Sequence, residues 1–322
     1  MSALDPEVVI LLDMIREADK PSLQSLSPEA ARIAYATSRN LLQAQTQEVA
    51  SVRDVTVPGA QDGLRLRIYR AASTQASDIL PCLVYYHGGG WVVGDLDSHD
   101  RLCRILANRA RICLIAVDYR LAPEHIFPAA LDDAASALQW VSDNAAALSI
   151  APGRIGVAGD SAGGNLAAVV ALMGRDGSAP ATIHQALLYP AVDLTASSPS
   201  YQREIAAGAP LSGATMHYFI DHYIPDAKER LDWHASPLKA ASLAGTPPAL
   251  VVTLGHDPLC DEGRAYAQRL ENDGVRVTAL HLSDQIHGML MMGGVLQAAN
   301  RTTDFIGDAI GAALHHGSPT SR

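Results

Sequence analysis

Cysteine is scarce in this chain, with 4 among 322 residues, and no two of them form a Cys-x-x-Cys pair. The sequence also has no His-Glu-x-x-His segment or other spacing typical of a metal site. Cys82 and Cys113 fall within apolar runs, where a cysteine usually packs as a small apolar side chain. We therefore expect neither a metal ion nor another cofactor.

Basic charge and long apolar runs are lacking as well. The formal net charge is -10, and no basic run is present, which argues against nucleic acid and anionic membrane surfaces as partners. No apolar run is long enough to span a membrane, and no basic segment followed by an apolar stretch suggests a signal peptide. These absences predict a cytoplasmic protein, and 48% hydrophobic residues suffice for one large core.

A serine stands at the apex of a strand–turn–helix pattern. The apolar run Ile155–Ala158 precedes the segment Gly-Asp-Ser-Ala-Gly, whose central residue is Ser161, and a run of small residues follows. A nucleophile on so tight a turn has a strained backbone, and a side chain two residues away on either side would collide with it. The pattern predicts that Ser161 is a nucleophile and that the Ala162 amide lies in the first turn of a helix, where N–H groups lack partners.

Three consecutive glycines follow a second apolar segment. Leu80–Tyr86 predicts a buried strand, and Gly88, Gly89 and Gly90 come one residue later. Consecutive glycines cost backbone entropy, and their use is to bring amides close to a ligand. In acyl transfer such amides stabilise the oxyanion, so we assign this role to Gly88–Gly90 and Ala162. A nucleotide-binding loop is excluded because no G-x-G-x-x-G or G-K-S/T pattern opens a helix.

A serine nucleophile needs a base, and the base needs a carboxylate that fixes its tautomer. After a nucleophile turn of this kind the chain order is Ser, acid, His. Asp257 follows the buried strand Ala249–Leu254, and His287 is the one histidine of 12 in a loop after the last predicted strand. Asp261 and Asp284 are alternative acids, but Asp261 begins the next helix and Asp284 shares the loop of His287. The predicted triad is Ser161, Asp257 and His287.

Several motifs occur together and in order, and through them the chain resembles the hormone-sensitive-lipase-like family of α/β-hydrolases, in its bacterial carboxylesterase branch. The resemblance runs from about residue 50 to the C-terminal helix, and it implies a catalytic triad, an oxyanion loop in which the second and third glycines point inward, and a cap over the active site. The sequence departs from the family at Cys260, Met289 and Ile126, which affects the pocket and no catalytic group. The matching segments are His87–Trp91, Asp118–His125, Gly159–Asn165, Ser236–Leu238, Asp257–Leu259 and His287–Gly288.

Eight apolar or alternating segments predict strands, and most of them alternate with helical segments. Such alternation predicts an α/β-hydrolase fold, with an eight-stranded, mostly parallel sheet and helices on both faces. The first two strands are joined by Pro58–Gly63, which is typical of a hairpin turn. The predicted strands are Val52–Val57, Leu64–Tyr69, Leu80–Tyr86, Ile112–Val117, Arg154–Ala158, His184–Tyr189, Leu250–Leu254 and Val275–Leu282.

Two segments do not fit this alternation. Residues 1–48 carry two helical apolar patterns, and residues from about 195 to 235 separate two strands. Within the second segment, Leu211–Ile220 predicts a helix with Ser212 as its N-cap. We expect the two segments to form a small helical cap on a hydrolase domain that spans residues 49–322. The alternative is that they are ordinary surface helices.

Four apolar residues are candidates for the substrate pocket: Trp91, Met216, Phe219 and Leu290. They follow the glycine loop, lie in the second cap segment or follow the base, and they predict an apolar pocket that buries a short acyl chain. The alternative is that they only pack the cap on the core.

The sequence therefore predicts a serine carboxylesterase that hydrolyses short- to medium-chain acyl esters of small molecules through an acyl-enzyme. Amidase, lactonase or deacetylase activity would use the same machinery and stays open. Some plant members of the family are non-catalytic hormone receptors, but they lack the histidine that stands here as His287. The last strand, Val275–Leu282, would lie at a sheet edge, where unpaired backbone groups favour a homodimer.

Overall fold

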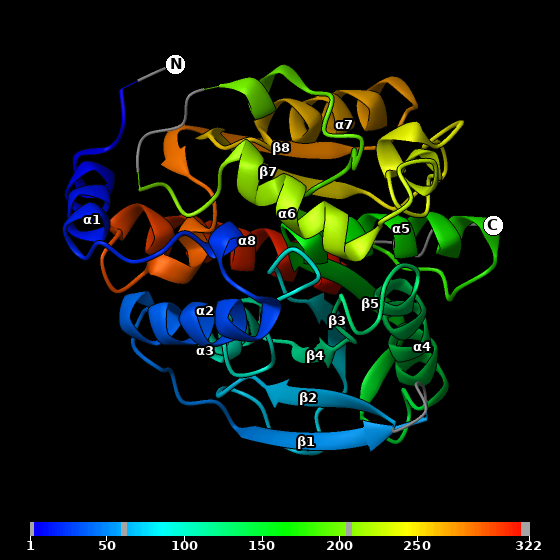
Figure 1. Ribbon diagram of the computed structural model, residues 1–322. Helices are drawn as coiled ribbons and strands as arrows, with labels where there is room; N and C mark the ends of the chain where they lie inside the picture. The colour runs from blue at the N-terminus through cyan, green and yellow to red at the C-terminus, as the bar shows by residue number, and fades with distance from the viewer. Residues whose placement is uncertain (1–2, 59–62, 204–207, 317–322) are drawn as a thin grey trace.

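The structure is a computed structural model that describes residues 3–58, 63–203 and 208–316. Its centre is an eight-stranded sheet in the order β1-β2-β4-β3-β5-β6-β7-β8, seen in Figure 1 from β1 at the bottom to β8 at the top. Strand β2 pairs antiparallel with both β1 and β4, and every later pair is parallel. The predicted mixed, mostly parallel sheet is confirmed, although residues 59–62 of the predicted hairpin turn lie outside the described residues.

All eight predicted strands are present, and their ends differ most at the fifth, predicted at 154–158 and found at 150–160, and at the last. The sequence placed this strand at 275–282, but β8 extends to Ile286, since pairing with β7 continues past a bulge to the His256–Ile286 pair. Asp284 therefore lies in a strand and not in a loop. The strands are β1 Ser51–Val57, β2 Leu64–Arg70, β3 Leu80–Tyr86, β4 Cys113–Asp118, β5 Ile150–Asp160, β6 Gln185–Leu188, β7 Ala249–His256 and β8 Val277–Ile286.

Helices cover both faces of the sheet, because successive strand residues point to opposite sides. In β3, Cys82 and Val84 pack into a core with helices α4 (Ala129–Asp143), α5 (Ala162–Asp176) and α7 (Cys260–Asn272). Leu83 and Tyr85 point the other way, into a second core with α3 (Asp100–Ala110) and α8 (Gln297–His316). A strand that is buried on both faces has a continuous apolar sequence, and for this reason β3 could be predicted.

The two segments outside the alternation form helices α1 (Pro6–Glu17), α2 (Pro28–Leu42) and α6 (Gly213–Tyr223). Ser212 caps α6 as predicted, since its side chain accepts a hydrogen bond from the Thr215 amide. In Figure 1, α6 crosses in front of the central strands, and α1 and α2 lie to its left. Arg32 of α2 donates to the Val92 and Ala122 carbonyls, so α2 is attached to the segment that follows the glycine loop.

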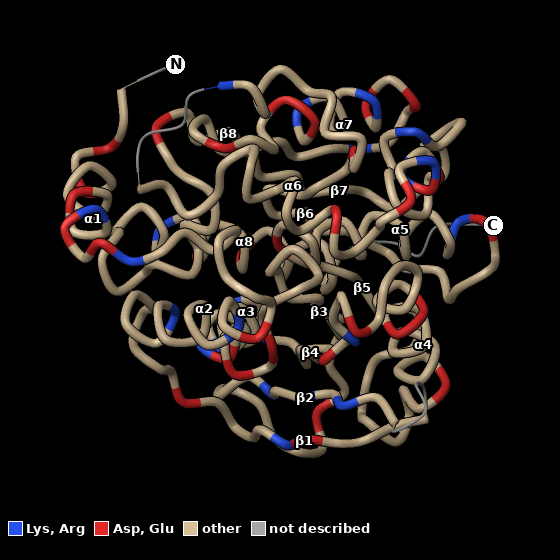
Figure 2. Tube along the Cα trace, viewed as in Figure 1, with Lys and Arg blue, Asp and Glu red and all other residues tan. Residues whose placement is uncertain are grey.

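Charged residues lie mostly around the periphery of the molecule, and the central part of the trace is largely uncharged (Figure 2). Among the described residues, no helix is long and apolar enough to cross a membrane. The four cysteines are all buried and free. Most charged side chains therefore lie outside the two cores, and the buried carboxylates and histidines near Ser161 are exceptions.

Candidate active site

Ser161 lies at the turn between β5 and α5 in a conformation that few residues adopt. Its backbone has φ 55° and ψ -116°, a strained combination for a residue with a side chain. The turn is closely packed, because a Cβ atom on Gly163 would lie 1.9 Å from the Tyr86 carbonyl oxygen and one on Gly159 would lie 2.3 Å from the Gly163 backbone. The glycines on either side are therefore required sterically, as the sequence pattern indicates.

The three predicted triad residues meet in one hydrogen-bonded chain. His287 Nε2 is 3.0 Å from Ser161 Oγ, and His287 Nδ1 is 2.7 Å from Asp257 Oδ2. The second oxygen of Asp257, Oδ1, accepts the Leu259 amide hydrogen at 2.8 Å. Asp257 is buried, and only 11% of the His287 side chain is exposed. This arrangement can remove a proton from the serine and hold it on the imidazole.

The two alternative acids are engaged elsewhere. Asp261 lies in the first turn of α7, and both of its oxygens accept from Arg203 at 2.7 Å. Asp284 lies within β8, and its backbone carbonyl accepts from the Asp5 amide. Neither residue has a hydrogen bond to His287 in the described part of the chain, so geometry selects Asp257.

The glycine loop presents two free amides, and not the three that the sequence suggested. The Gly88 N–H donates to Asp160 Oδ1 at 2.9 Å and is therefore not available to a ligand. The amides of Gly89 and Gly90 have no protein acceptor among the described residues, and neither has that of Ala162. Gly89 and Gly90 have φ values of 131° and 58°, which side chains disfavour.

A buried carboxylate holds the glycine loop from behind. Asp160 Oδ1 accepts from the Tyr85 hydroxyl at 2.8 Å as well as from Gly88, and His99 Nε2 is 3.3 Å away. Burial raises the pKa of the Asp160 carboxyl, but the neighbouring His99 and these hydrogen bonds outweigh burial and lower it to about 2. Asp160 therefore stays ionised and fixes the first glycine. In the sequence, Asp160 is only the residue before Ser161, and no signal there indicates this role.

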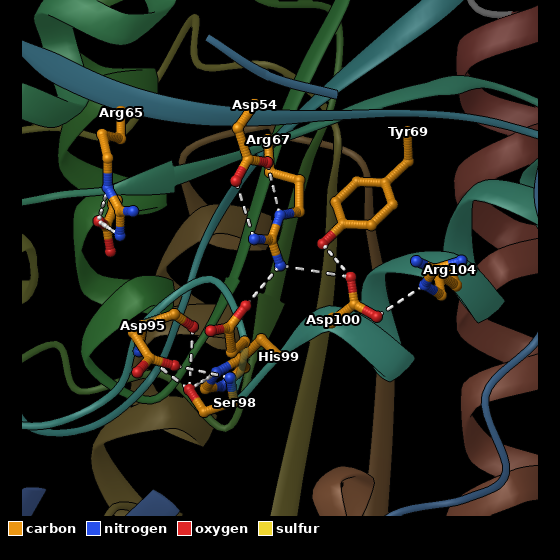
Figure 3. A network of polar contacts seen from close by, with 11 residues as sticks. Asp54, Arg65, Arg67, Tyr69, Asp95, Ser98, His99, Asp100 and Arg104 are labelled. Carbon is orange, nitrogen blue, oxygen red and sulfur yellow. Dashed lines mark hydrogen bonds and ion pairs between the residues drawn. The ribbon is translucent and has the colours of Figure 1, made fainter. Parts of the chain in front are cut away.

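His99 is positioned in turn by the loop before α3. Its Nδ1 is 3.0 Å from the Ser98 hydroxyl, and Ser98 and Asp95 bond to one another through backbone and side chain (Figure 3). Next to this loop, Arg67 of β2 binds both Asp54 and Asp97, which ties the loop to the sheet (Figure 3). The support of the glycine loop thus extends to the edge of the sheet.

All four predicted pocket residues are buried, and the contacts of two of them are defined. The Trp91 indole is fully buried and stacks on Tyr223 of α6, with ring centroids 4.6 Å apart, so it packs α6 onto the glycine loop. Phe219 of α6 lies against Gly90, where an added Cβ atom would meet its ring at 2.2 Å. Met216 and Leu290 are buried as well. The geometry favours packing for Trp91 and a place beside the free amides for Phe219.

Glu262 is a structural residue that no sequence signal revealed. It is fully buried at the start of α7, and its Oε1 accepts from the Val192 amide at 2.7 Å and the Asp193 amide at 3.2 Å. Burial raises its pKa well above the usual value. Glu262 links the helix after Asp257 to the loop after β6. In the described ranges, no group of three or more histidine, cysteine or acidic residues could hold a metal ion.

Comparison with known proteins matches residues 83–291 to the alpha/beta hydrolase fold family. Carboxylic ester hydrolase LipN of Mycobacterium tuberculosis is 42% identical over 245 residues, which span 74% of this chain and 64% of LipN, just under two thirds of that protein. Ethyl acetate hydrolase of Pseudomonas putida is 35% identical over 317 residues, or 96% of this chain and 98% of that protein.

A solved structure agrees over nearly the whole chain. Ester-hydrolase EH1AB1 from the metagenome of Lake Arreo, complexed with a bipyridine phosphonate derivative, superposes with a TM-score of 0.92. The two sequences are 40% identical, and the match covers 96% of this chain and 98% of that one. The fold is therefore shared with this ester hydrolase over nearly its whole length.

Proposed function

Because the chain belongs to the α/β-hydrolase fold family and is a carboxylic ester hydrolase, we propose that it cleaves short- and medium-chain acyl esters through an acyl-enzyme on Ser161. The observation that carries this proposal is the chain of two hydrogen bonds, 3.0 Å from Ser161 to His287 and 2.7 Å from His287 to Asp257. A ligand-binding protein would have no need of this arrangement, and its cost in backbone strain at Ser161 would serve no purpose.

In the proposed mechanism, His287 Nε2 takes the proton of Ser161 as Oγ attacks the ester carbonyl. Asp257 holds the proton on His287 Nδ1 and stabilises the imidazolium that forms. The imidazolium then protonates the leaving alcohol. Water, deprotonated by the same nitrogen, attacks the acyl-enzyme and releases the acid. The acid and base steps thus use one imidazole in turn.

The oxyanion of each tetrahedral intermediate is proposed to lie between the amides of Gly89, Gly90 and Ala162. This assignment is supported by their lack of protein acceptors within the described segments and by the position of Ala162 at the start of α5. Gly88 contributes indirectly, since its bond to Asp160 orients the peptide that leads to Gly89.

We propose that residues 1–48 and 195–235 cap the active site, although residues 204–207 of the second segment lie outside the described part. The contact of Phe219 with Gly90 supports this, since it brings α6 to the proposed oxyanion hole. An acyl chain under this cap would gain about 0.8 kcal/mol for each buried methylene until the space is filled.

The test is a series of 4-nitrophenyl esters from two to sixteen acyl carbons. We expect kcat/KM to be highest at roughly four to eight carbons and to decline beyond about ten. A highest value at sixteen carbons, with activation at an oil–water interface, would identify a lipase and refute the proposed chain-length preference.

A homodimer through β8 is proposed as the working assembly. β8 is the last strand of the sheet, and its outer residues are partly or fully exposed over most of its length. An unpaired edge of this length can pair with a second copy. Light scattering at micromolar concentration should give twice the mass of the chain, and a single-chain mass would contradict the proposal. The cytoplasmic location stays a prediction.

A further inference from the structure

Arg39 is a buried cation that has no counter-ion among the residues the structure describes. It lies on α2 with only 8% of its surface exposed, and its Nε and Nη1 atoms are buried without a hydrogen-bond acceptor among the described residues. Its guanidinium carbon is 4.6 Å from the centre of the Tyr35 ring, a contact that compensates only part of the lost hydration. An arginine cannot release its proton in a protein, so the buried charge persists and requires a partner.

Other arginines on the same side of the molecule do have partners. Arg32, two turns earlier on α2, binds both oxygens of Glu124 and two backbone carbonyls. Arg120 binds both oxygens of Asp133. Arg39 differs from both, because it has no carboxylate partner among the described residues, and the Tyr35 hydroxyl that it also meets carries no charge.

The guanidinium of Arg39 lies beside the catalytic histidine. A Cβ atom on Gly288, the residue after His287, would be 3.5 Å from Arg39 Nη2. Tyr189 lies near both residues. Its ring is edge-on to the His287 ring, with centroids 5.0 Å apart, and the positive charge of Arg39 lowers the pKa of its hydroxyl. Burial raises the pKa of Tyr189 well above its usual value, so this neighbour supplies no negative charge.

The buried carboxylates of the active site already have other partners. Asp257 is committed to His287 and the Leu259 amide, and Asp160 is committed to Tyr85 and Gly88. The planar guanidinium matches a carboxylate through two parallel hydrogen bonds, and such a pair is strongest where water is excluded.

We propose that Arg39 binds a carboxylate carried by the substrate, so that the enzyme prefers esters with an anionic group on the acyl or alcohol part. This inference rests on the proposed function, because it assigns the substrate class of that same site. The carboxylate replaces the missing counter-ion of Arg39 and orients the ester relative to Ser161. A neutral ester of equal length leaves the guanidinium unpaired.

The kinetic experiment compares charged and neutral esters of matched length by titration of the released acid. The acyl series pairs the monoethyl esters of succinic, glutaric and adipic acid with ethyl butanoate, pentanoate and hexanoate. The alcohol series pairs carboxymethyl butanoate with ethyl butanoate. In Arg39→Met, we expect the ratio of kcat/KM for charged to neutral ester to fall by roughly 10- to 100-fold in at least one series. Arg39→Lys should restore part of the ratio.

Arg32→Met is the matched control, since it removes an arginine from the same helix that already has protein partners. It should leave the ratio unchanged even where it lowers stability. A binding readout avoids turnover: in Ser161→Ala protein, monoethyl glutarate should raise Tm, and the added Arg39→Met substitution should abolish the rise.

The outcomes separate the two proposals. If Ser161→Ala protein still hydrolyses esters at a tenth of the original rate, the proposed function is wrong. A second outcome is that hydrolysis depends on Ser161 while Arg39→Met leaves the charged-to-neutral ratio of kcat/KM unchanged in both series and the rise in Tm unchanged as well. In that case Arg39 is solvated by water only, and the inference is overturned.

Discussion

Replacing Asp257 by asparagine should reverse the tautomer of His287. In the wild type, Asp257 Oδ1 accepts the Leu259 amide hydrogen at 2.8 Å, and Oδ2 faces His287 Nδ1 at 2.7 Å. In Asp257→Asn the amide oxygen must stay on Leu259, because that N–H needs an acceptor. The NH2 group then faces Nδ1 and can only donate, so the imidazole proton moves to Nε2.

An Nε2 that carries a proton cannot accept one from Ser161, which lies 3.0 Å away. We expect kcat to fall by roughly 10³- to 10⁴-fold, or about 4 to 5.5 kcal/mol of transition-state stabilisation. KM should change little, since Asp257 is only 1% exposed and binds the imidazole nitrogen that faces away from Ser161. Stability should stay close to that of the wild type, because the replacement is isosteric and keeps the bond to Leu259.

The assay is steady-state hydrolysis of 4-nitrophenyl butanoate by purified protein, with thermal unfolding measured on the same samples. Asp284→Asn is the control in β8 and should retain nearly full activity. A folded Asp257→Asn protein with activity within tenfold of the wild type would show that the tautomer argument is wrong. A large loss in Asp284→Asn instead would move the acid to that residue.

Three further predictions concern the nucleophile, its turn and the buried histidines. Ser161→Ala should unfold at the wild-type temperature and lose about 10³-fold or more in kcat/KM, and activity at a tenth of wild type would contradict the assignment. Gly163→Ala should lose about 3 kcal/mol of stability or more in urea unfolding, because its Cβ would lie 1.9 Å from the Tyr86 oxygen, and an unchanged midpoint would exclude this clash. Burial lowers the pKa of both His87 and His184 to about 4, so between pH 6.5 and 4 the unfolded chain binds protons that the folded protein does not, and stability falls as pH falls. Each of the two histidines should lower the free energy of unfolding by about 2 kcal/mol at pH 5 relative to pH 7. Between these pH values His184→Gln should therefore lose about 2 kcal/mol less stability than the wild type, and equal losses would show that His184 is not the source.

Features that depend on the local geometry of neighbouring residues could be predicted from the sequence alone. A strained serine requires glycines two residues away on both sides, and a strand buried on both faces must be continuously apolar. Both requirements fix the residue types at given spacings, and for this reason the strained turn at Ser161, the strand β3 and the mostly parallel sheet were predicted correctly. The role of Ser161 as nucleophile stays a prediction. The rule that carboxyl ends of parallel strands share one edge also placed Asp257 and His287 near one another, since each follows a strand by a few residues.

The hydrogen-bond partners of individual polar groups could not be predicted from the sequence, because they come from segments far apart along the chain. Nothing near Gly88 shows that its amide is bound by Asp160, 72 residues later. The residues alone therefore left the three glycines equivalent, and only the family resemblance singled out the second and the third. The end of β8 depends on its pairing with β7, which carried the strand through Asp284. The same holds for Arg39: the sequence shows that an arginine is present, but only the packed molecule shows that no carboxylate in the described ranges forms an ion pair with it.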